Sequence, residues 1–471
     1  MQFQSFIFIQ FFLLFYASYL LLMGNFKAQN VLLVIASYIF YGYWDWRFLF
    51  LLIFSTVVDF VVAKLIDRTA SERQKKIWLG VSLVSNLSIL GFFKYFNFFT
   101  ASFTDLLSTI GIPVNDLTVK VILPVGISFY TFQTLSYTID VYRGHLKPAK
   151  SIIDFAVYVA FFPQLVAGPI ERATSFLPQI SNPRKIDLSQ INAGIFLIIW
   201  GYFKKLVIAD NLAQIADSIF NNYSDYQGLD IIIGILSFTI QIYCDFSAYS
   251  DIARGLAKLI GFELMVNFRL PFFALNPSDF WSRWHISLSS WLRDYLYISL
   301  GGNRQGTFNT YRNLFLTMLL GGLWHGAAWN FIWWGMYQGL ILVIYRLIAG
   351  SNEKRSLKDT SIISVISQML IMFILTNVGW VIFRSNSGEQ IIYLLTHWSL
   401  ARSENTVSLG KELLFFTTPL LIVQLWQHLS RDLLIITKLP NWFTNIIYSF
   451  FLINICLYGV RQSTEFIYFQ F

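Results

Sequence analysis

Two histidines, His285 and His325, are the residues of this chain whose type and surroundings could support chemistry. The chain has five histidines in 471 residues, and His325 lies in LLGGLWHGAAWNFIWWG (residues 319–335), an almost unbroken apolar stretch. An ionisable side chain is costly inside a membrane segment, and where one occurs it usually marks a functional site. A neutral imidazole is a suitable general base for taking a proton from a hydroxyl group during acyl transfer. The position also allows a second reading, in which the histidine only hydrogen-bonds to a neighbouring helix.

Glycines stand on both sides of the Trp324–His325 pair, in the segment GLWHG. Because glycine has no side chain, a substrate or another backbone can approach the imidazole closely. Acyl transfer also needs a group that stabilises negative charge on the carbonyl oxygen. The sequence offers Asn276, the indole N–H of Trp324 or a backbone amide for this role, and it does not choose among them.

His285 lies in NPSDFWSRWHISLSSWLRDYLYISLGGNRQG, residues 276–306. The spacing predicts an amphipathic helix over residues 279–297, with a tryptophan-rich apolar face suited to the membrane interface. The opposite, polar face would carry Ser282, His285, Ser289 and Arg293. The arginines around it predict that this helix lies on the cytoplasmic side. The polar face could bind the polar part of an acyl donor; the alternative is a simple interfacial anchor.

Composition places the chain among polytopic membrane proteins. Hydrophobic residues make up 56% of it and charged residues 13%, against about 25% charged residues in soluble domains. The formal net charge of +8 is explained by cytoplasmic loops rich in Lys and Arg, so a nucleic-acid partner is not expected. A basic cytoplasmic mouth would also attract a phosphorylated donor such as coenzyme A. Zinc-ligand spacing, a Walker loop and a dinucleotide fingerprint are absent from the sequence, so no metal is expected.

The predicted architecture is an all-α membrane bundle forming a single domain over residues 1–471. Many windows reach the roughly 20 apolar residues that a spanning helix needs. Segments 152–168 and 312–325 are short or interrupted, which suggests re-entrant segments shielded by protein or by a water-filled cavity. The predicted spans are 5–24, 28–44, 48–66, 77–97, 119–141, 152–168, 190–212, 229–250, 312–325, 328–348, 362–384, 413–428 and 443–461.

The loops predict the orientation. Loops 67–76 and 350–358 are rich in Lys and Arg and are expected in the cytosol, whereas loops 98–118 and 213–228 contain neither and are expected outside. Counting spans from these loops places the N-terminus and the C-terminus on the extracytoplasmic side.

Several long blocks of this sequence resemble the membrane-bound O-acyltransferase family, and within it the membrane subunits of bacterial alginate O-acetyltransferases. The resemblance extends over nearly the whole chain. Its blocks are PVGISFYTFQTLSYTIDVYRG (124–144), FFPQLVAGPIER (161–172), YCDFSAYSDIARGLAKLIGF (243–262), NFRLPFFALNPSDFWSRWHISLSSWLRDYLYISLGGNR (267–304) and LLGGLWHGAAWNFIWWG (319–335).

The resemblance implies a bundle of about eleven transmembrane helices with additional re-entrant and interfacial helices, in the bacterial inner membrane. It implies that His325 is the catalytic histidine in a tunnel through the protein, and that His285 is the second family histidine, nearer the cytoplasmic mouth. The donor would be a cytoplasmic acetyl carrier, acetyl-CoA. Periplasmic acetyltransferase partner proteins would complete the transfer to an exported polysaccharide such as alginate.

Two alternatives follow from other readings of the same residues. One is a D-alanyl transfer protein of teichoic acid modification, which takes its acyl group from a carrier protein. The other is a transporter without covalent chemistry, with intramembrane charges along its path. Such transporters often contain inverted repeats, and the sequence shows no internal repeat.

Overall fold

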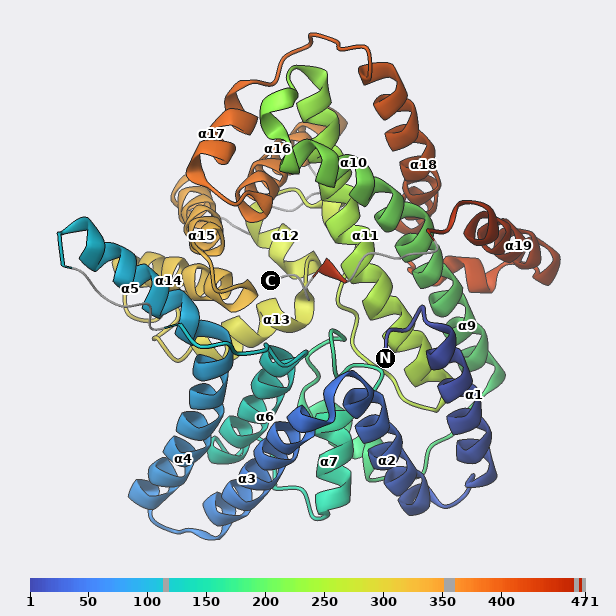
Figure 1. Ribbon diagram of the computed structural model, residues 1–471. Helices are drawn as coiled ribbons and strands as arrows, with labels where there is room; N and C mark the ends of the chain where they lie inside the picture. Colours follow the sequence, from blue (N-terminus) through green and yellow to red (C-terminus); the bar gives the residue numbers. More distant parts are fainter. Residues whose placement is uncertain (113–117, 351–360, 461–465, 468–471) are drawn as a thin grey trace. The chain divides into compact units, whose positions relative to one another are not determined.

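In a computed structural model of the protein, the described part of the chain is built of helices and connecting loops and contains no β-strand (Figure 1). The described residues are 1–112, 118–350, 361–460 and 466–467. The predicted all-α architecture is therefore confirmed for them.

The chain divides into two compact units. Unit 1 consists of Met1–Gly194 and Ala253–Met265, and unit 2 consists of Ile195–Ile252 and Val266–Phe471. The prediction of one membrane domain over the whole chain stays a prediction, because two compact units can belong to one domain.

Seven helical stretches in the described residues are long and apolar enough to cross a bilayer, so the chain is a multi-pass membrane protein. A shorter apolar helix, α1 (Phe6–Leu21), precedes them. The predicted number of about eleven spans stays a prediction. The seven stretches are Phe26–Arg68, Glu72–Thr109, Leu188–Asn221, Leu229–Leu259, Trp329–Ala349, Ile362–Arg384 and Thr406–Ser430.

Unit 1 is a helical bundle in which α3 packs against both α4 and α6, and α2 against α7. Its helices after α1 are α2 (Phe26–Asp45), α3 (Leu49–Arg68), α4 (Glu72–Leu90), α5 (Phe96–Thr109), α6 (Ile127–Tyr142), α7 (Ile152–Ala160) and α8 (Ala173–Ile180).

A buried carboxyl group links three helices of unit 1. Asp59 on α3 is fully buried, and it accepts hydrogen bonds from Ser82 Oγ at 2.5 Å and Asn86 Nδ2 at 2.9 Å on α4. Thr138 Oγ1 on α6 donates to it at 3.2 Å. A buried carboxyl group is costly unless hydrogen-bonded, so this network favours one arrangement of the three helices.

The helix break predicted within 152–168 is confirmed. Helix α7 ends at Ala160, and the chain continues as a buried, non-helical segment. Its backbone is hydrogen-bonded by local turns, such as Gly168 N to Gln164 O at 2.8 Å, and by Ser37, whose Oγ accepts from Phe162 N at 3.1 Å. Irregular backbone at membrane depth requires such partners within the protein.

Unit 2 contains most of the remaining helices, and its α14, α15 and α16 pack in sequence, with α12 against α15. The helices are α9 (Leu188–Tyr202), η3 (Phe203–Ala209), α10 (Asp210–Asn221), α11 (Leu229–Leu259), α12 (Pro277–Arg283), α13 (Ile286–Trp291), η6 (Leu292–Tyr297), α14 (Thr307–His325), α15 (Trp329–Ala349), α16 (Ile362–Arg384), α17 (Gly388–Thr396), α18 (Thr406–Ser430) and α19 (Asn441–Tyr458). The first residues of α9 and the last residues of α11, from Ala253 on, belong to unit 1.

Buried ion pairs join the π-helix η3 to α10 and α11. Lys205 Nζ lies 2.8 Å from Asp210 Oδ1 and 2.7 Å from Asp245 Oδ1, and Lys204 Nζ lies 2.8 Å from Asp251 Oδ2. Charges inside a membrane protein are expected to pair in this way.

The prediction of one continuous amphipathic helix over 279–297 is wrong. The helix stops at Arg283 and restarts at Ile286, because His285 between them adopts a left-handed backbone conformation, with φ 43° and ψ 53°. An L-residue in that conformation interrupts a right-handed helix. The result is two short helices, α12 and α13, followed by the π-helix η6.

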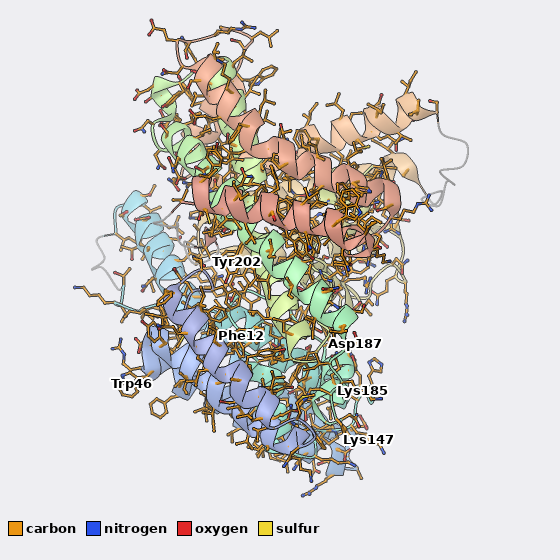
Figure 2. The ribbon with its side chains drawn as sticks, turned by 90° about the vertical axis from the view of Figure 1, so that its right-hand side faces the viewer. Phe12, Trp46, Lys147, Lys185, Asp187 and Tyr202 are labelled. Carbon is orange, nitrogen blue, oxygen red and sulfur yellow. The ribbon has the colours of Figure 1, made fainter. Side chains whose placement is uncertain are left out.

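Basic residues occur on the connecting loops of unit 1. Figure 1 shows the loop between α3 and α4 (residues 69–71) at the lower end of this unit; Arg68 is the last residue of α3, and Arg73 lies in the first turn of α4. Figure 2 labels Lys147 and Lys185, from two other loops, on one side of the view and Trp46 on the opposite side. Lys354, Arg355, Lys358 and Asp116, on which part of the orientation prediction depends, lie outside the described residues.

Candidate functional site

The position of His325 depends on a close approach between α14 and α15. A Cβ atom on Gly322 would lie 2.3 Å from Phe331 O and 2.8 Å from Gly335 Cα, so only glycine fits there. The two backbones are therefore in direct contact one helical turn before His325, the last residue of α14. Gly322 thus allows another backbone to come close, whereas the predicted close approach of a substrate or backbone to the imidazole itself stays a prediction.

Aromatic rings surround the His325 imidazole, which is 4% exposed. The ring centroids of Trp324, Trp334 and Phe383 lie 5.1, 5.0 and 5.6 Å from its centroid, each in an edge-to-face arrangement. These rings come from three packed helices, α14, α15 and α16. A site enclosed in this way excludes water, which strengthens hydrogen bonds formed inside it.

The two histidines singled out in the sequence lie together. The His285 and His325 ring centroids are 6.4 Å apart, and Trp324 lies beside both, 5.8 Å from His285. His285 is fully buried and packs edge-to-face on Phe246 of α11, at 4.6 Å. His285 therefore lies in the cluster of aromatic rings around His325, called the aromatic site below, and not on an exposed polar face.

Asn267 orients the His285 ring. Its Oδ1 lies 3.2 Å from His285 Nδ1 and also accepts hydrogen bonds from Ser287 N at 3.2 Å and Ser287 Oγ at 3.0 Å. Its Nδ2 donates to Ser250 Oγ at 3.3 Å. Because an amide oxygen only accepts, His285 Nδ1 is the donor and Nε2 carries the lone pair.

Burial also fixes the protonation state of His285, which lies in the connection between α12 and α13 and outside the spanning helices. Desolvation lowers the pKa of His285 to about 3, partly opposed by a backbone hydrogen bond. The imidazole is therefore neutral at physiological pH, and its Nε2 can accept a proton or a hydrogen bond.

A pocket of about 390 Å³ lies beside the aromatic site in unit 2, and it brings together Ser282, Ser289 and Arg293, three of the residues predicted to bind substrate. A second arginine, Arg346 of α15, also lines it. The pocket is therefore polar and positively charged on one part of its wall. Because most of the lining is apolar, this charged part could hold the anionic portion of a ligand that also has an apolar portion.

Asn276 is not among the residues that line the pocket, and no ring of the aromatic site comes from it. Its side chain caps α12, where Oδ1 accepts a hydrogen bond from Asp279 N at 2.8 Å. Asparagine is a preferred residue at this position of a helix. Its predicted role in stabilising an oxyanion stays a prediction.

The sequence analysis missed Asn267, Trp334 and Phe383 as members of the site. Asn267 precedes His285 by 18 residues, and the chain between them is not one continuous helix or strand, so periodicity could not predict their contact. Trp334 and Phe383 stand in long apolar segments, where core packing is the ordinary reading of an aromatic residue. A signal does exist for Trp334, since it lies in the same quoted block as His325.

No group of three or more His, Cys, Asp or Glu side chains suited to a metal ion occurs in the part of the chain that the structure describes. The expectation that the protein needs no metal stays a prediction.

A family model now connects this geometry to known proteins. The model of the membrane-bound O-acyltransferase family matches residues 40–381, which include both histidines. The chain belongs to the membrane-bound O-acyltransferase family. It is accordingly a membrane-bound O-acyltransferase, and the resemblance seen in the sequence is confirmed.

Relatives of this acyltransferase carry more specific names. It is 43% identical over 388 residues to a probable alginate O-acetylase of Pseudomonas aeruginosa, covering 82% of this chain and 72% of that protein. It is 38% identical to a peptidoglycan O-acetyltransferase of Helicobacter pylori, covering 77% and 72%. A teichoic acid D-alanyltransferase of Bacillus subtilis is 26% identical, covering 55% and 68%.

Proposed function

We propose that this acyltransferase moves acetyl groups from acetyl-CoA in the cytosol toward a polysaccharide outside the membrane. The observation that carries the proposal is the pairing of two buried histidines, His285 and His325, in an aromatic site beside a polar pocket. The names of the more similar relatives support acetyl transfer over D-alanyl transfer, because the D-alanyltransferase is both less similar and matched over less of the chain.

The reaction proposed at His325 is the transfer of an acetyl group from a thioester to a hydroxyl group. The imidazole takes the proton of an acceptor hydroxyl while the oxygen forms a bond to the acetyl carbon of the thioester. The carbonyl electron pair moves to oxygen, giving a tetrahedral intermediate. When this collapses, the C–S bond breaks and the thiolate receives the proton from the imidazolium. General-base assistance of this type contributes typically about 10²–10⁴-fold to a rate.

The location follows from the substrates. Acetyl-CoA carries phosphates and remains in the cytosol, whereas an exported polysaccharide is outside. We assign the protein to the bacterial inner membrane, with the basic loop around Arg73 in the cytosol and both termini outside. A site reached from both sides lets the acetyl group cross without coenzyme A. Extracytoplasmic acetyltransferase partners would then complete the transfer to the alginate-like or other polysaccharide.

The pocket lined by Ser282, Ser289 and Arg293 suits the polar part of the donor. Arg293 has an exposed side chain paired with Asp294 at 2.7 Å, so it can exchange this partner for a phosphate group. Arginine binds phosphate oxygens through several donors at once.

We expect Arg293→Ala to raise the KM for acetyl-CoA about tenfold and to leave kcat close to wild type, because a contact made equally in the ground and transition states affects KM alone. Purified protein in detergent or nanodiscs, assayed over a range of donor concentrations, gives both constants. Arg304→Ala is the matched control, since Arg304 is an exposed arginine of the same region and is not part of the pocket wall. Equal effects of the two substitutions would reject a specific donor site at Arg293.

The proposed function is tested by mass analysis of surface polymer from cells with and without the protein. We expect ester-linked acetate to be present only when the protein is present and to be removed by mild alkali. Ester-linked D-alanine in its place would show that the donor assignment is wrong and that the alternative within the family is correct. No change in any ester would reject polymer acylation altogether.

A further inference from the structure

Two buried tryptophans next to the histidine pair have indole N–H groups without a hydrogen-bond partner in the described residues. Trp334 is 1% exposed and Trp380 is 3% exposed, and Nε1 of each is inaccessible to solvent. Buried tryptophans usually find a partner for this donor, and leaving it unmade destabilises the protein. Such an exception in a native site calls for an explanation, and a substrate atom is one that a catalytic site can supply.

Trp334 is the one of these two tryptophans that packs against His325. The two ring centroids are 5.0 Å apart at an interplanar angle of 86°. Trp380 lies behind it, stacked on Trp334 at 6.1 Å and packed against Trp284 at 4.9 Å. The indole ring of Trp334 therefore contacts the imidazole directly, whereas the ring of Trp380 packs on Trp334 and Trp284.

The residue facing Trp334 Nε1 from α16 is a glycine. A Cβ on Gly379 would lie 3.6 Å from Nε1, and also 2.8 Å from Gln338 Nε2. Gly379 therefore offers no side-chain acceptor to this indole nitrogen, and the space beside the glycine is occupied by Gln338 and Tyr337 of α15.

We propose that Trp334 Nε1–H donates a hydrogen bond to the acyl oxygen that becomes negatively charged during transfer at His325. The proposal rests on the proposed acyl transfer. An indole N–H only donates, so Trp334 can act neither as base nor as nucleophile, and this leaves stabilisation of the oxyanion as its chemical role. The hydrogen bond strengthens when the carbonyl electron pair moves to oxygen and weakens when the C–S bond breaks. A rigid donor in a water-excluded site is well suited to this task.

The proposed donor, Trp334, differs from Trp324, whose indole N–H was named from the sequence as a candidate for the same role. Trp324 and Trp334 lie on opposite helices of the α14–α15 pair, and each ring is within about 5 Å of His325. Separate replacement of the two indole groups can therefore assign the donor.

The test is the replacement of Trp334 by β-(3-benzothienyl)alanine, which keeps the shape of tryptophan and substitutes sulfur for the N–H group. We expect kcat for acetyl-CoA to fall about 10²–10³-fold, the size seen when one oxyanion donor is removed, with an unchanged KM. The same replacement at Trp380 is the matched control and should change kcat by less than about threefold. Membrane abundance and the thermal unfolding midpoint are measured for both variants, so that a folding defect is recognised.

The proposal is overturned if the Trp334 variant, folded like wild type, keeps a kcat similar to that of the Trp380 variant. It is also overturned if the replacement at Trp324 causes the large loss and that at Trp334 does not. Failure of the proposed function gives a different result: the wild-type protein would not consume acetyl-CoA. The same comparison is then made with a D-alanyl carrier-protein thioester, for which the oxyanion and its donor are the same.

Discussion

Replacing His325 by alanine is expected to lower the rate of acyl transfer by about 10²–10⁴-fold, the usual contribution of a general base. The imidazole is the buried ionisable group at the end of α14, enclosed by Trp324, Trp334 and Phe383. Without it, the acceptor hydroxyl would have to lose its proton to water, which the aromatic rings exclude. The measurement is release of free coenzyme A from acetyl-CoA by purified protein, together with acetate esters on the polymer of complemented cells.

His397→Ala is the control for this substitution, since His397 is an exposed histidine. We expect it to keep full activity. The amount of His325→Ala protein in the membrane should be close to wild type, because the α14–α15 contact at Gly322 does not depend on the imidazole. Full acetylation by a well-expressed His325→Ala protein would show that this histidine is structural.

His285→Ala is expected to lower kcat at least about tenfold and to leave the KM for the donor nearly unchanged. The sequence left two roles open, in donor binding or in proton transfer. The structure places His285 against Trp324 and within 6.4 Å of His325, and the wall of the polar pocket does not include it. An interaction made in the transition state appears in kcat, whereas uniform donor binding appears in KM.

Asn267→Ala provides a companion measurement for His285. Asn267 holds Nδ1 of the ring, so its loss should lower kcat in the same direction but by less. Since burial lowers the pKa of His285 to about 3, its imidazole is neutral at both pH 6 and pH 8, and the loss in kcat for His285→Ala should be equal at the two values. A raised KM with unchanged kcat would reassign His285 to donor binding.

The parts of the fold that the sequence predicted are those with a local signal. Long apolar windows predicted a multi-pass membrane protein, and the interruption expected within 152–168 agrees with the end of α7 at Ala160. Family blocks containing His285 and His325 predicted the site histidines, and their spatial proximity is consistent with that assignment.

What could not be predicted depends on contacts between distant residues. The spacing of tryptophans over 279–297 favours one helix, but the left-handed conformation of His285 is imposed by backbone hydrogen bonds to the preceding segment, such as Ile286 N to Asn267 O at 2.9 Å. The same contacts bury His285 and leave Ser282, Ser289 and Arg293 at a different surface. Local propensity gives way to tertiary contacts at such positions.

The left-handed backbone at His285 has a consequence for engineering the enzyme. A non-glycine residue in that conformation costs roughly 1–2 kcal/mol, and glycine would adopt it without strain. Glycine at position 285 would nevertheless not stabilise the protein, because it would leave a cavity beside Phe246 and Trp324 and remove the hydrogen bond to Asn267. The contacts of the imidazole thus hold the backbone in its strained conformation, and stabilising substitutions should be sought at other positions.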